Sequence, residues 1–270
     1  MTDEAPGMMP GREKIDTQVP HSARIWNYWL GGKDHYPVDR EAGEAFREIY
    51  PDIVKVARAA RYFLARTVRY IAGEAGIRQF LDVGTGLPVA DNTHEVAQRV
   101  APESRIVYVD NDPLVLVHAR ALLTSRPEGA CAYVDADARD ARKVLDAAAR
   151  TLDFSRPVSL MLVGILGHVA DDDEARSIVR QLVGALPPGS YLTLSDGANT
   201  SKVREQAHDR YAQTGAVPYR LRSPEQIQAF FDGLELLEPG IVPVSQWRPD
   251  PSPFGPPHHV DTFGGVARKG

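Results

Sequence analysis

The sequence predicts an α/β fold: a doubly wound, mostly parallel sheet with a reversed last strand, preceded by an N-terminal helical cap. Three observations lead to this prediction. After residue 76, short apolar runs alternate with segments of helical length, a Gly-x-Gly turn follows the first run, and no helix separates the last two runs. Such alternation indicates βαβ units, which build a parallel sheet with helices on both of its faces.

The N-terminal part of the sequence predicts a mobile tail and then the helical cap. The tail, residues 1–20, is polar and rich in Pro and Gly, and the cap covers residues 21–76. Capping residues, prolines at helix starts and glycines after helix ends divide the cap into three helices. Their expected ranges are Ala23–Leu30, Pro37–Ile49 and a long helix from Asp52 to Gly73 or Gly76.

The rest of the chain, residues 77–270, is expected to form one integrated domain. The strand-like runs before its last helix are Arg78–Val83, Arg105–Asp110, Cys131–Val134, Val158–Val163 and Tyr191–Ser195. The helical segments that alternate with them are Asp91–Val100, Pro113–Leu123, Ala138–Leu152, Asp172–Leu186 and Thr200–Gln213. Ser223 begins a further helix, with Gln226 placed for a capping box. The last two runs, Leu234–Val242 and Val260–Arg268, are expected to be antiparallel neighbours because no crossover helix joins them.

The composition is that of a globular protein with one large domain or two small ones. Of the 270 residues, 43% are hydrophobic and 25% are charged, and 31 basic and 36 acidic residues give a net charge of −5. An acidic chain lacks the broad positive field of non-specific nucleic-acid binding, so we expect no nucleic-acid partner. No apolar run has the length of a membrane span and the N-terminus shows no secretory signal, so we expect a cytoplasmic protein without a membrane partner.

The cysteine and histidine patterns predict no metal site. The single cysteine, Cys131, excludes an intramolecular disulfide and a cysteine-rich metal cage, and we interpret it as a core residue. His258 and His259 are adjacent, so a strand would point them to opposite faces. No other spacing of histidine, cysteine or acidic residues is typical of metal ligands.

The first strand ends in a glycine turn, Asp82-Val83-Gly84-Thr85-Gly86, and the second strand ends at Asp110. Glycine lets the backbone approach a ligand without a Cβ in the way. An acid at the end of the second strand suits the two hydroxyls of a ribose, so the pair of features predicts a ligand that contains adenosine. The simpler alternative is that Asp82 caps the turn and Asp110 caps the next helix, a role that Asn111 or Asp112 could also fill.

Two adenosine-containing ligands are compared, a dinucleotide and S-adenosylmethionine. A dinucleotide site has a third glycine in its turn, but Val89 follows Pro88 here. Asp82 would repel a pyrophosphate, whereas it suits the ammonium group of S-adenosylmethionine. The phosphate-binding motif G-x-x-x-x-G-K-[ST] is absent as well, which argues against nucleotide hydrolysis. We therefore predict S-adenosylmethionine as the cofactor.

Four segments resemble, in the same order, the motifs of class I S-adenosylmethionine-dependent methyltransferases, which have a Rossmann-like fold. They are Asp82–Gly86, Asp110, Ala136–Asp140 and Leu162–Val169. The resemblance implies that Asp110 binds the ribose, that Asp137 contacts the adenine amino group and that the amide of Ala138 reaches the adenine ring. The cofactor-binding residues expected in these segments, or directly after Asp110, are Asp82, Gly84, Thr85, Gly86, Asp110, Asn111, Asp137, Ala138 and Ile165.

A second resemblance covers nearly the whole chain after residue 20. The segments that carry it are His21–Tyr36, Leu81–Pro88 and Phe263–Lys269. They are similar to a largely actinobacterial S-adenosyl methyltransferase family that was formerly described as a domain of unknown function. The resemblance implies a methyltransferase fold and its cofactor, and it supplies no acceptor.

The aromatic segment from Trp26 to Tyr36 is expected to close over the cofactor as a lid. Aromatic faces stabilise a sulfonium by cation–π attraction, and the polar residues among these rings favour a binding site. From this segment we expect Asn27, Tyr28 and Gly31 at the cofactor. The alternative is that the rings only pack the first helix onto the domain.

His168 follows the fourth strand, where doubly wound folds bind their ligands, and it is the candidate general base. Its alternative role is helix capping or packing. The whole pattern favours an enzyme that transfers a methyl group from S-adenosylmethionine to a small-molecule acceptor, because the chain is acidic and a lid would enclose the site. The alternatives are a non-catalytic S-adenosylmethionine-binding protein and a NAD-dependent oxidoreductase. The motifs of nucleic-acid base methylation, Asn-Pro-Pro-aromatic and Pro-Cys, are absent after the fourth strand.

Overall fold

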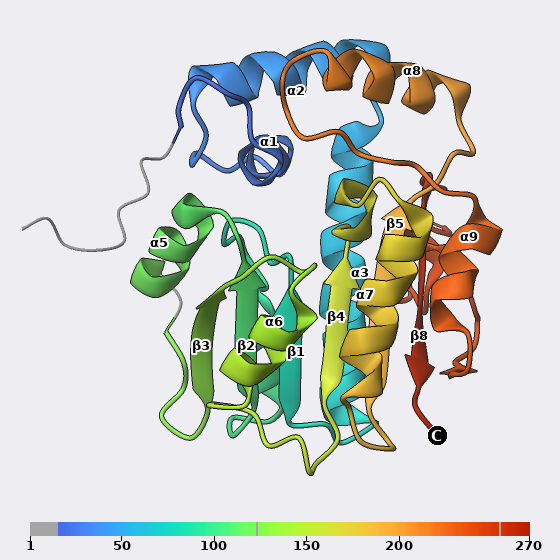
Figure 1. Ribbon diagram of the computed structural model, residues 1–270. Helices are drawn as coiled ribbons and strands as arrows, with labels where there is room; N and C mark the ends of the chain where they lie inside the picture. Colours follow the sequence, from blue (N-terminus) through green and yellow to red (C-terminus); the bar gives the residue numbers. More distant parts are fainter. Residues whose placement is uncertain (1–15, 123, 254) are drawn as a thin grey trace, which may run out of the picture.

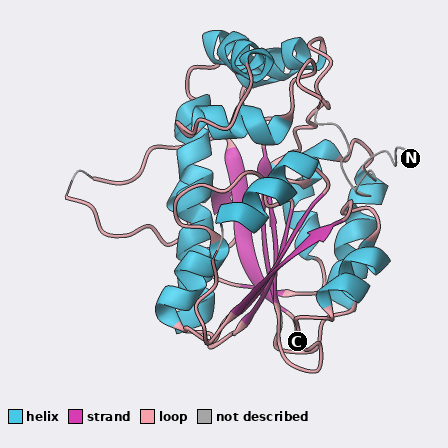
Figure 2. Cartoon of the chain, turned by 90° about the vertical axis from the view of Figure 1, so that its left-hand side faces the viewer, coloured by secondary structure: helices cyan, strands magenta, loops and turns pink. Residues whose placement is uncertain are grey.

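The computed structural model describes residues 16–122, 124–253 and 255–270, and it confirms the α/β fold. Figure 1 shows a central sheet whose parallel strands point toward a layer of three helices, α1, α2 and α8, at the top of the molecule. Figure 2, turned by 90°, shows that further helices cover both faces of the sheet. Of the tail predicted over residues 1–20, residues 1–15 lie outside the described part of the chain.

The helices lie close to their predicted ranges, and several begin at the caps that the sequence indicates. They are α1 (Ser22–Trp29), α2 (Pro37–Ile49), α3 (Ile53–Gly73), α4 (Thr93–Val100), α5 (Pro113–Leu122), α6 (Ala141–Ala148), α7 (Asp172–Gly184), α8 (Lys202–Ala212) and α9 (Pro224–Gln228), with short 3₁₀ helices η1 (Leu166–His168), η2 (Ala229–Phe231) and η3 (Val244–Gln246). The capping box predicted at Ser223 and Gln226 is present at the start of α9. Among the described residues, no helix combines the length and the apolar character that a membrane span needs.

The sheet has the predicted parallel core and reversed last strand. Its strands are β1 (Gln79–Val83), β2 (Arg105–Asp110), β3 (Ala130–Asp135), β4 (Ser159–Val163), β5 (Tyr191–Gly197), β6 (Glu235–Leu236), β7 (Val242–Pro243) and β8 (Thr262–Arg268). Their order is β3-β2-β1-β4-β5-β8-β6, and β7 also pairs with β8. Strands β1 to β5 are parallel, and β8 is antiparallel to β5. The order reverses between β1 and β4, the place where doubly wound sheets bind ligands.

One predicted strand is wrong in its extent. The run Leu234–Val242 forms two short strands, β6 and β7, instead of one, although both are antiparallel to β8 as expected. Between them the chain turns at Gly240, whose φ of +84° is open to glycine and unfavourable for other residues. Pro239, just before this turn, has no N–H to donate to a neighbouring strand.

Alternate residues of the strands enter two cores, one on each face of the sheet. On one face Phe80 of β1 packs with Phe63 and Ile71 of α3. On the other face Leu81 packs with the group that includes Ile178 of α7 and Val144 of α6. This two-residue alternation holds the strands in register and fixes the edge at which all the parallel strands end.

Candidate functional site

A cavity of about 300 Å³ lies at the carboxyl ends of the parallel strands, and residues of α1 and α8 are part of its lining. Figure 1 shows both helices above this end of the sheet. Its walls come from the segments that follow β1 to β4, from β5 and β8, and from the helices of the upper layer. The predicted site residues that line it are Asn27, Asp82, Gly84, Thr85, Gly86, Asp110, Asn111, Asp137, Ala138, Ile165 and His168. Tyr28 and Gly31 were also expected at the cofactor, but they are not among the lining residues.

The glycine turn and the acid of β2 are joined directly. Gly84 and Gly86 both have positive φ angles, +78° and +67°. The amide of Gly84 donates to the carbonyl of Val109 at 2.8 Å, and the amide of Gly86 donates to Oδ2 of Asp110 at 2.9 Å. Burial raises the pKa of Asp110 above its usual range. Asp112 instead caps α5, by accepting from the amide of Leu114 at 2.8 Å.

Asp82 lies at the floor of the cavity with only 4% of its surface exposed. Its Oδ2 accepts a hydrogen bond of 2.6 Å from the hydroxyl of Thr93, which opens α4. Burial raises the pKa of Asp82 to about 6, against the opposing effects of Thr93 and the nearby Arg61 guanidinium. The carboxyl group is therefore mostly ionised at neutral pH and largely protonated at pH 5.

The acids and amides after β2 and β3 form a short chain of contacts. Asn111 donates from Nδ2 to Oδ2 of Asp137 at 3.1 Å. Arg139 pairs with the same Asp137 carboxylate at 3.2 Å and donates to the carbonyl of His168 at 2.9 Å. Ile165 packs against the glycine turn from the end of β4, where a Cβ added to Gly84 would lie 2.6 Å from its side chain. These contacts bring the four motif-like segments together around one space.

His168 ends η1, directly after β4, and lines the cavity. Its ring meets the ring of Tyr219 edge to face, with centroids 5.0 Å apart. The buried Nδ1 atom has no hydrogen-bond partner among the described residues. Burial lowers the pKa of the imidazole to about 4, so the ring is neutral at neutral pH.

The aromatic segment lines the cavity as expected, but Tyr28 does not take part. Ile25, Trp26 and Trp29 line the cavity, together with Asn27, whose Oδ1 accepts from the amide of Asp34 at 3.1 Å. Tyr28 turns toward α2 instead. It lies over Gly43, where an added Cβ would meet its ring at 2.9 Å.

A buried ion pair holds α1 in place over the cavity. Arg24 of α1 and Asp39 of α2 are 3.1 Å apart, and both are almost completely buried. Asp39 also accepts from the amides of His21 and Tyr36, each at 2.8 Å. One carboxylate of α2 thus binds the residue before α1 and the residue at the end of the aromatic segment.

Several polar residues of the cavity wall were not predicted from the sequence. They are His21, Arg61, Ser195, Arg204, His208, Tyr219 and Thr262. For two of these residues the sequence does contain a signal. Arg204 and His208 are four residues apart, and Tyr211 follows three residues later, so the three side chains lie on one face of α8. Arg61 points from α3 to the segment before α4, where it donates to the carbonyls of Ala90 and Asp91.

The comparisons with known proteins agree with this geometry. The sequence matches the S-adenosyl methyltransferase family over residues 8–270. A DUF574 family protein from Streptomyces avermitilis MA-4680 is 48% identical, with a TM-score of 0.91 over 95% of this chain and 100% of that one. A protein from Thermobifida fusca YX, assigned to the methyltransferases, is 40% identical, with a TM-score of 0.86 over 94% and 97% of the two chains.

A more distant structure has a similar fold. The magnesium protoporphyrin IX methyltransferase from Synechocystis PCC 6803, solved with S-adenosylhomocysteine, is 12% identical, with a TM-score of 0.52 over 91% of this chain and 93% of that one. At this identity the similarity concerns the Rossmann-like fold alone. Among proteins with curated functions, none matches the chain.

Proposed function

Because the chain belongs to the S-adenosyl methyltransferase family, we propose that it methylates a small organic molecule bound in the cavity beneath α1 and α8. The protein is an S-adenosylmethionine-dependent methyltransferase, and the dinucleotide and non-catalytic alternatives are set aside on this ground. The observation that supports a small acceptor is the cavity itself. It is lined by the predicted cofactor residues other than Tyr28 and Gly31 and, beside them, by a second group of polar and aromatic side chains.

We assign the cofactor to the part of the cavity over β1, β2 and β3. A Cβ added at Gly86 would meet nothing within 4 Å, so the turn leaves room for a ligand against its backbone. Asp110 accepts a backbone bond on each oxygen, and each oxygen has a second lone pair for a ribose hydroxyl. Asp82 supplies a negative charge for the ammonium group, and Asp137 an acceptor for the adenine amino group. S-adenosylmethionine, when bound, supplies a methyl group on a positively charged sulfur.

We assign His168 to the proton of the acceptor. A hydroxyl oxygen that attacks the methyl carbon becomes strongly acidic as the new O–C bond forms. A neutral imidazole whose pKa is about 4 is basic enough to take that proton, and Nδ1 of His168 is free to do so. Most of the rate acceleration would come from holding the acceptor at attack distance in the enclosed cavity.

Replacing Asp110 with alanine should weaken the binding of S-adenosylhomocysteine by about 1.5–3 kcal/mol, or roughly 10- to 150-fold, because charge-assisted hydrogen bonds to the ribose are lost. Isothermal titration calorimetry measures this change. The matched control is Asp140→Ala, which removes an acid that caps α6 outside the cavity and should leave the affinity unchanged. An unchanged affinity in Asp110→Ala would mean that Asp110 only caps the glycine turn.

The affinity for S-adenosylhomocysteine should fall about tenfold between pH 7 and pH 5, because the Asp82 carboxylate gains a proton near pH 6 and no longer attracts the ammonium group. The pKa of this acid is raised, so the binding-competent anion is lost as the pH falls. The variant Asp82→Asn should bind more weakly at pH 7 and show a flatter profile. Any slope that remains in the variant comes from a group other than Asp82. A wild-type profile that is flat from pH 7 to pH 5 would remove Asp82 from this role.

Residues 21–36 should act as a lid that the bound cofactor orders. Segments that close over active sites are locally less stable than the elements beneath them. Hydrogen exchange with and without S-adenosylhomocysteine should therefore show added protection in residues 21–36 and little change in α3. If exchange in residues 21–36 is identical in the two states, the segment is fixed packing and the lid is rejected.

A further inference from the structure

The part of the cavity beyond His168 is lined by other elements than the cofactor part. It lies over β4, β5 and β8, away from the glycine turn, and α8 forms one wall of it. Arg204, His208 and Tyr211 of α8 face this space at spacings of four and three residues. Figure 1 shows α8 lying beside α2 at the top of the molecule, so this wall belongs to the same layer as the lid.

Arg204 is a buried cation without a carboxylate partner. It is 3% exposed, and its Nη1 donates to the carbonyl of Asp261 and, at 3.2 Å, to the hydroxyl of Thr262. Among the described residues, neither Nε nor Nη2 makes a hydrogen bond and no acid forms an ion pair with Arg204, whose guanidinium carbon lies 6.0 Å from the centre of the Tyr50 ring. The nearby Asp261 carboxylate instead accepts from Tyr50 and Thr200, each at 2.8 Å.

Two other buried arginines, unlike Arg204, have carboxylate partners. Arg24 is paired with Asp39 at 3.1 Å, and Arg222 is paired with Asp196 and Asp172, each at 3.0 Å. Buried charges in proteins are as a rule paired, because an unpaired charge loses its hydration without compensation. The guanidinium of Arg204 has two hydrogen bonds and the face of the Tyr50 ring but no counter-charge, and it lies at the wall of a cavity, where an anion from outside the chain can complete the pair.

Neutral polar atoms around Arg204 also lack partners. Both ring nitrogens of His208, Nδ1 of His168 and the hydroxyl of Ser195 are buried and make no hydrogen bond to the described residues. Burial lowers the pKa of His208 to about 3, so neither histidine adds a positive charge at neutral pH. The space thus offers one full positive charge and several uncharged hydrogen-bonding groups.

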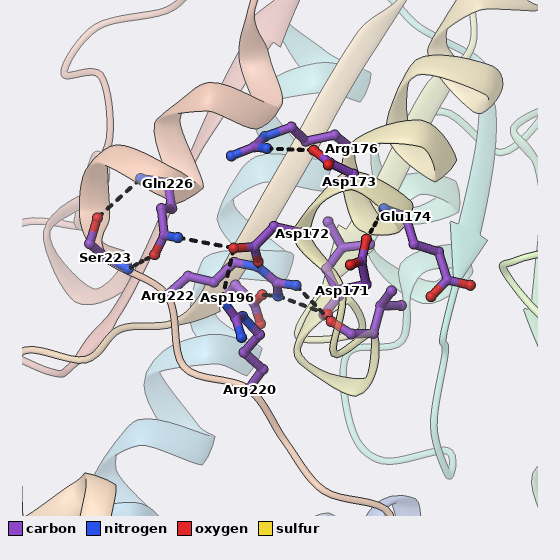
Figure 3. Close-up of polar contacts among 12 residues, drawn as sticks. Asp171, Asp172, Asp173, Glu174, Arg176, Asp196, Arg220, Arg222, Ser223 and Gln226 are labelled. Atoms are coloured by element: carbon purple, nitrogen blue, oxygen red, sulfur yellow. Dashed lines mark hydrogen bonds and ion pairs between the residues drawn. The ribbon is translucent and has the colours of Figure 1, made fainter.

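The remaining walls are aromatic. The rings of His208 and Tyr219 are stacked, with centroids 5.3 Å apart, and Phe46 meets His208 edge to face at 4.9 Å. Trp29 continues this surface, with its ring 5.2 Å from that of Phe46. The hydroxyl of Tyr219 donates to the buried carboxylate of Asp196, which also accepts from Arg222, so the position of this ring is fixed. Figure 3 shows Asp196 and Arg222 among their polar neighbours.

We propose that this part of the cavity binds the methyl acceptor, that the acceptor is an aromatic monocarboxylate, and that Arg204 binds its carboxylate. The proposal rests on the proposed function of the cavity, which it extends from a small molecule to a chemical class. The free Nε and Nη2 atoms form one edge of the guanidinium, and this edge matches the two oxygens of a carboxylate. A dianionic phosphate would leave one charge unpaired, because the neighbouring histidines are neutral.

The test compares aromatic carboxylates with their neutral amides on the protein saturated with S-adenosylhomocysteine. The probes are benzoate, 4-hydroxyphenylacetate, indole-3-acetate and 2-naphthoate, each paired with the amide of the same shape, with phenyl phosphate as the dianion. We expect at least one carboxylate to bind at least tenfold more tightly than its amide and than phenyl phosphate. Equal binding of every pair, the absence of carboxylate binding, or a preference for phenyl phosphate overturns the proposal.

Two variants connect the preference to Arg204. Arg204→Met should remove the difference between carboxylate and amide and keep the affinity for S-adenosylhomocysteine. Arg210→Met, which changes an exposed arginine of the same helix, should keep both. If Arg204→Met does not fold, Arg204→Lys is used instead. It keeps the positive charge but loses the two-nitrogen edge of the guanidinium, so it should show a smaller preference for carboxylate over amide. If either Arg204 variant prefers the carboxylate over the amide as strongly as the wild type does, the proposal is overturned. If the wild type does not bind S-adenosylhomocysteine, the proposed cofactor site is contradicted instead.

Discussion

Replacing Arg222 with methionine should lower the free energy of unfolding by about 3–5 kcal/mol, which urea denaturation followed by circular dichroism measures. Arg222 is 1% exposed, and its guanidinium donates to Asp196 and Asp172 and to the carbonyls of Leu166 and Val169 (Figure 3). Asp196 is completely buried, so the variant leaves its charge without a cation inside the protein. The loss of this compensation accounts for the expected size of the effect.

The neighbouring Arg220 provides the matched control. It pairs with the same Asp172 carboxylate at 2.8 Å, but its side chain is 45% exposed. Arg220→Met should therefore cost about 1 kcal/mol or less, since water replaces the pair at the surface. Adding Asp196→Asn to Arg222→Met should recover part of the lost stability, because it removes the unpaired charge. Equal effects of the two arginine variants would contradict the assignment of Arg222 as the buried centre of this network.

The sheet and the cofactor end of the cavity could be predicted because their signals are local. A short apolar run marks each strand of the parallel core, and the glycine turn from Asp82 to Gly86 fits within five residues. The acid at Asp110 becomes meaningful only through the βαβ order, which the alternation of elements also indicates. Parallel strands all end at the same edge of the sheet. Residues at the ends of these strands can therefore be predicted to lie close together from the order of the elements alone.

The other end of the cavity could not be predicted, because it depends on contacts between distant segments. Arg204 is one of many arginines in the sequence, and its lack of a carboxylate partner is a property of the folded chain alone. The position of Tyr28 could not be predicted from the sequence either. Ile25, Tyr28 and Trp29 share an apolar stripe, but the missing side chain of Gly43 in α2 makes room for Tyr28 on the side away from the cavity.

Replacing Gly84 with alanine should cost about 3 kcal/mol of unfolding free energy and weaken S-adenosylhomocysteine binding at least tenfold. The φ of +78° costs an alanine about 1–2 kcal/mol, and the new Cβ would lie 2.6 Å from Ile165, which adds about 1–3 kcal/mol of overpacking. Because Ile165 lines the cavity, its displacement also alters the cofactor site. Thermal or urea unfolding and calorimetry on the same variant measure the two effects.

The control for backbone strain is Gly76→Ala. Gly76 has a similar φ, +70°, and a Cβ there meets nothing within 4 Å, so this variant should lose only about 1–2 kcal/mol and should bind S-adenosylhomocysteine as the wild type does. In an Ile165→Gly background the stability cost of Gly84→Ala should fall to that of Gly76→Ala, because the side-chain atoms of residue 165 that overlap the new Cβ, its own Cβ among them, are gone. If the full cost of Gly84→Ala persists in that background, contact with Ile165 does not explain it, and the requirement for glycine at residue 84 lies in the backbone alone.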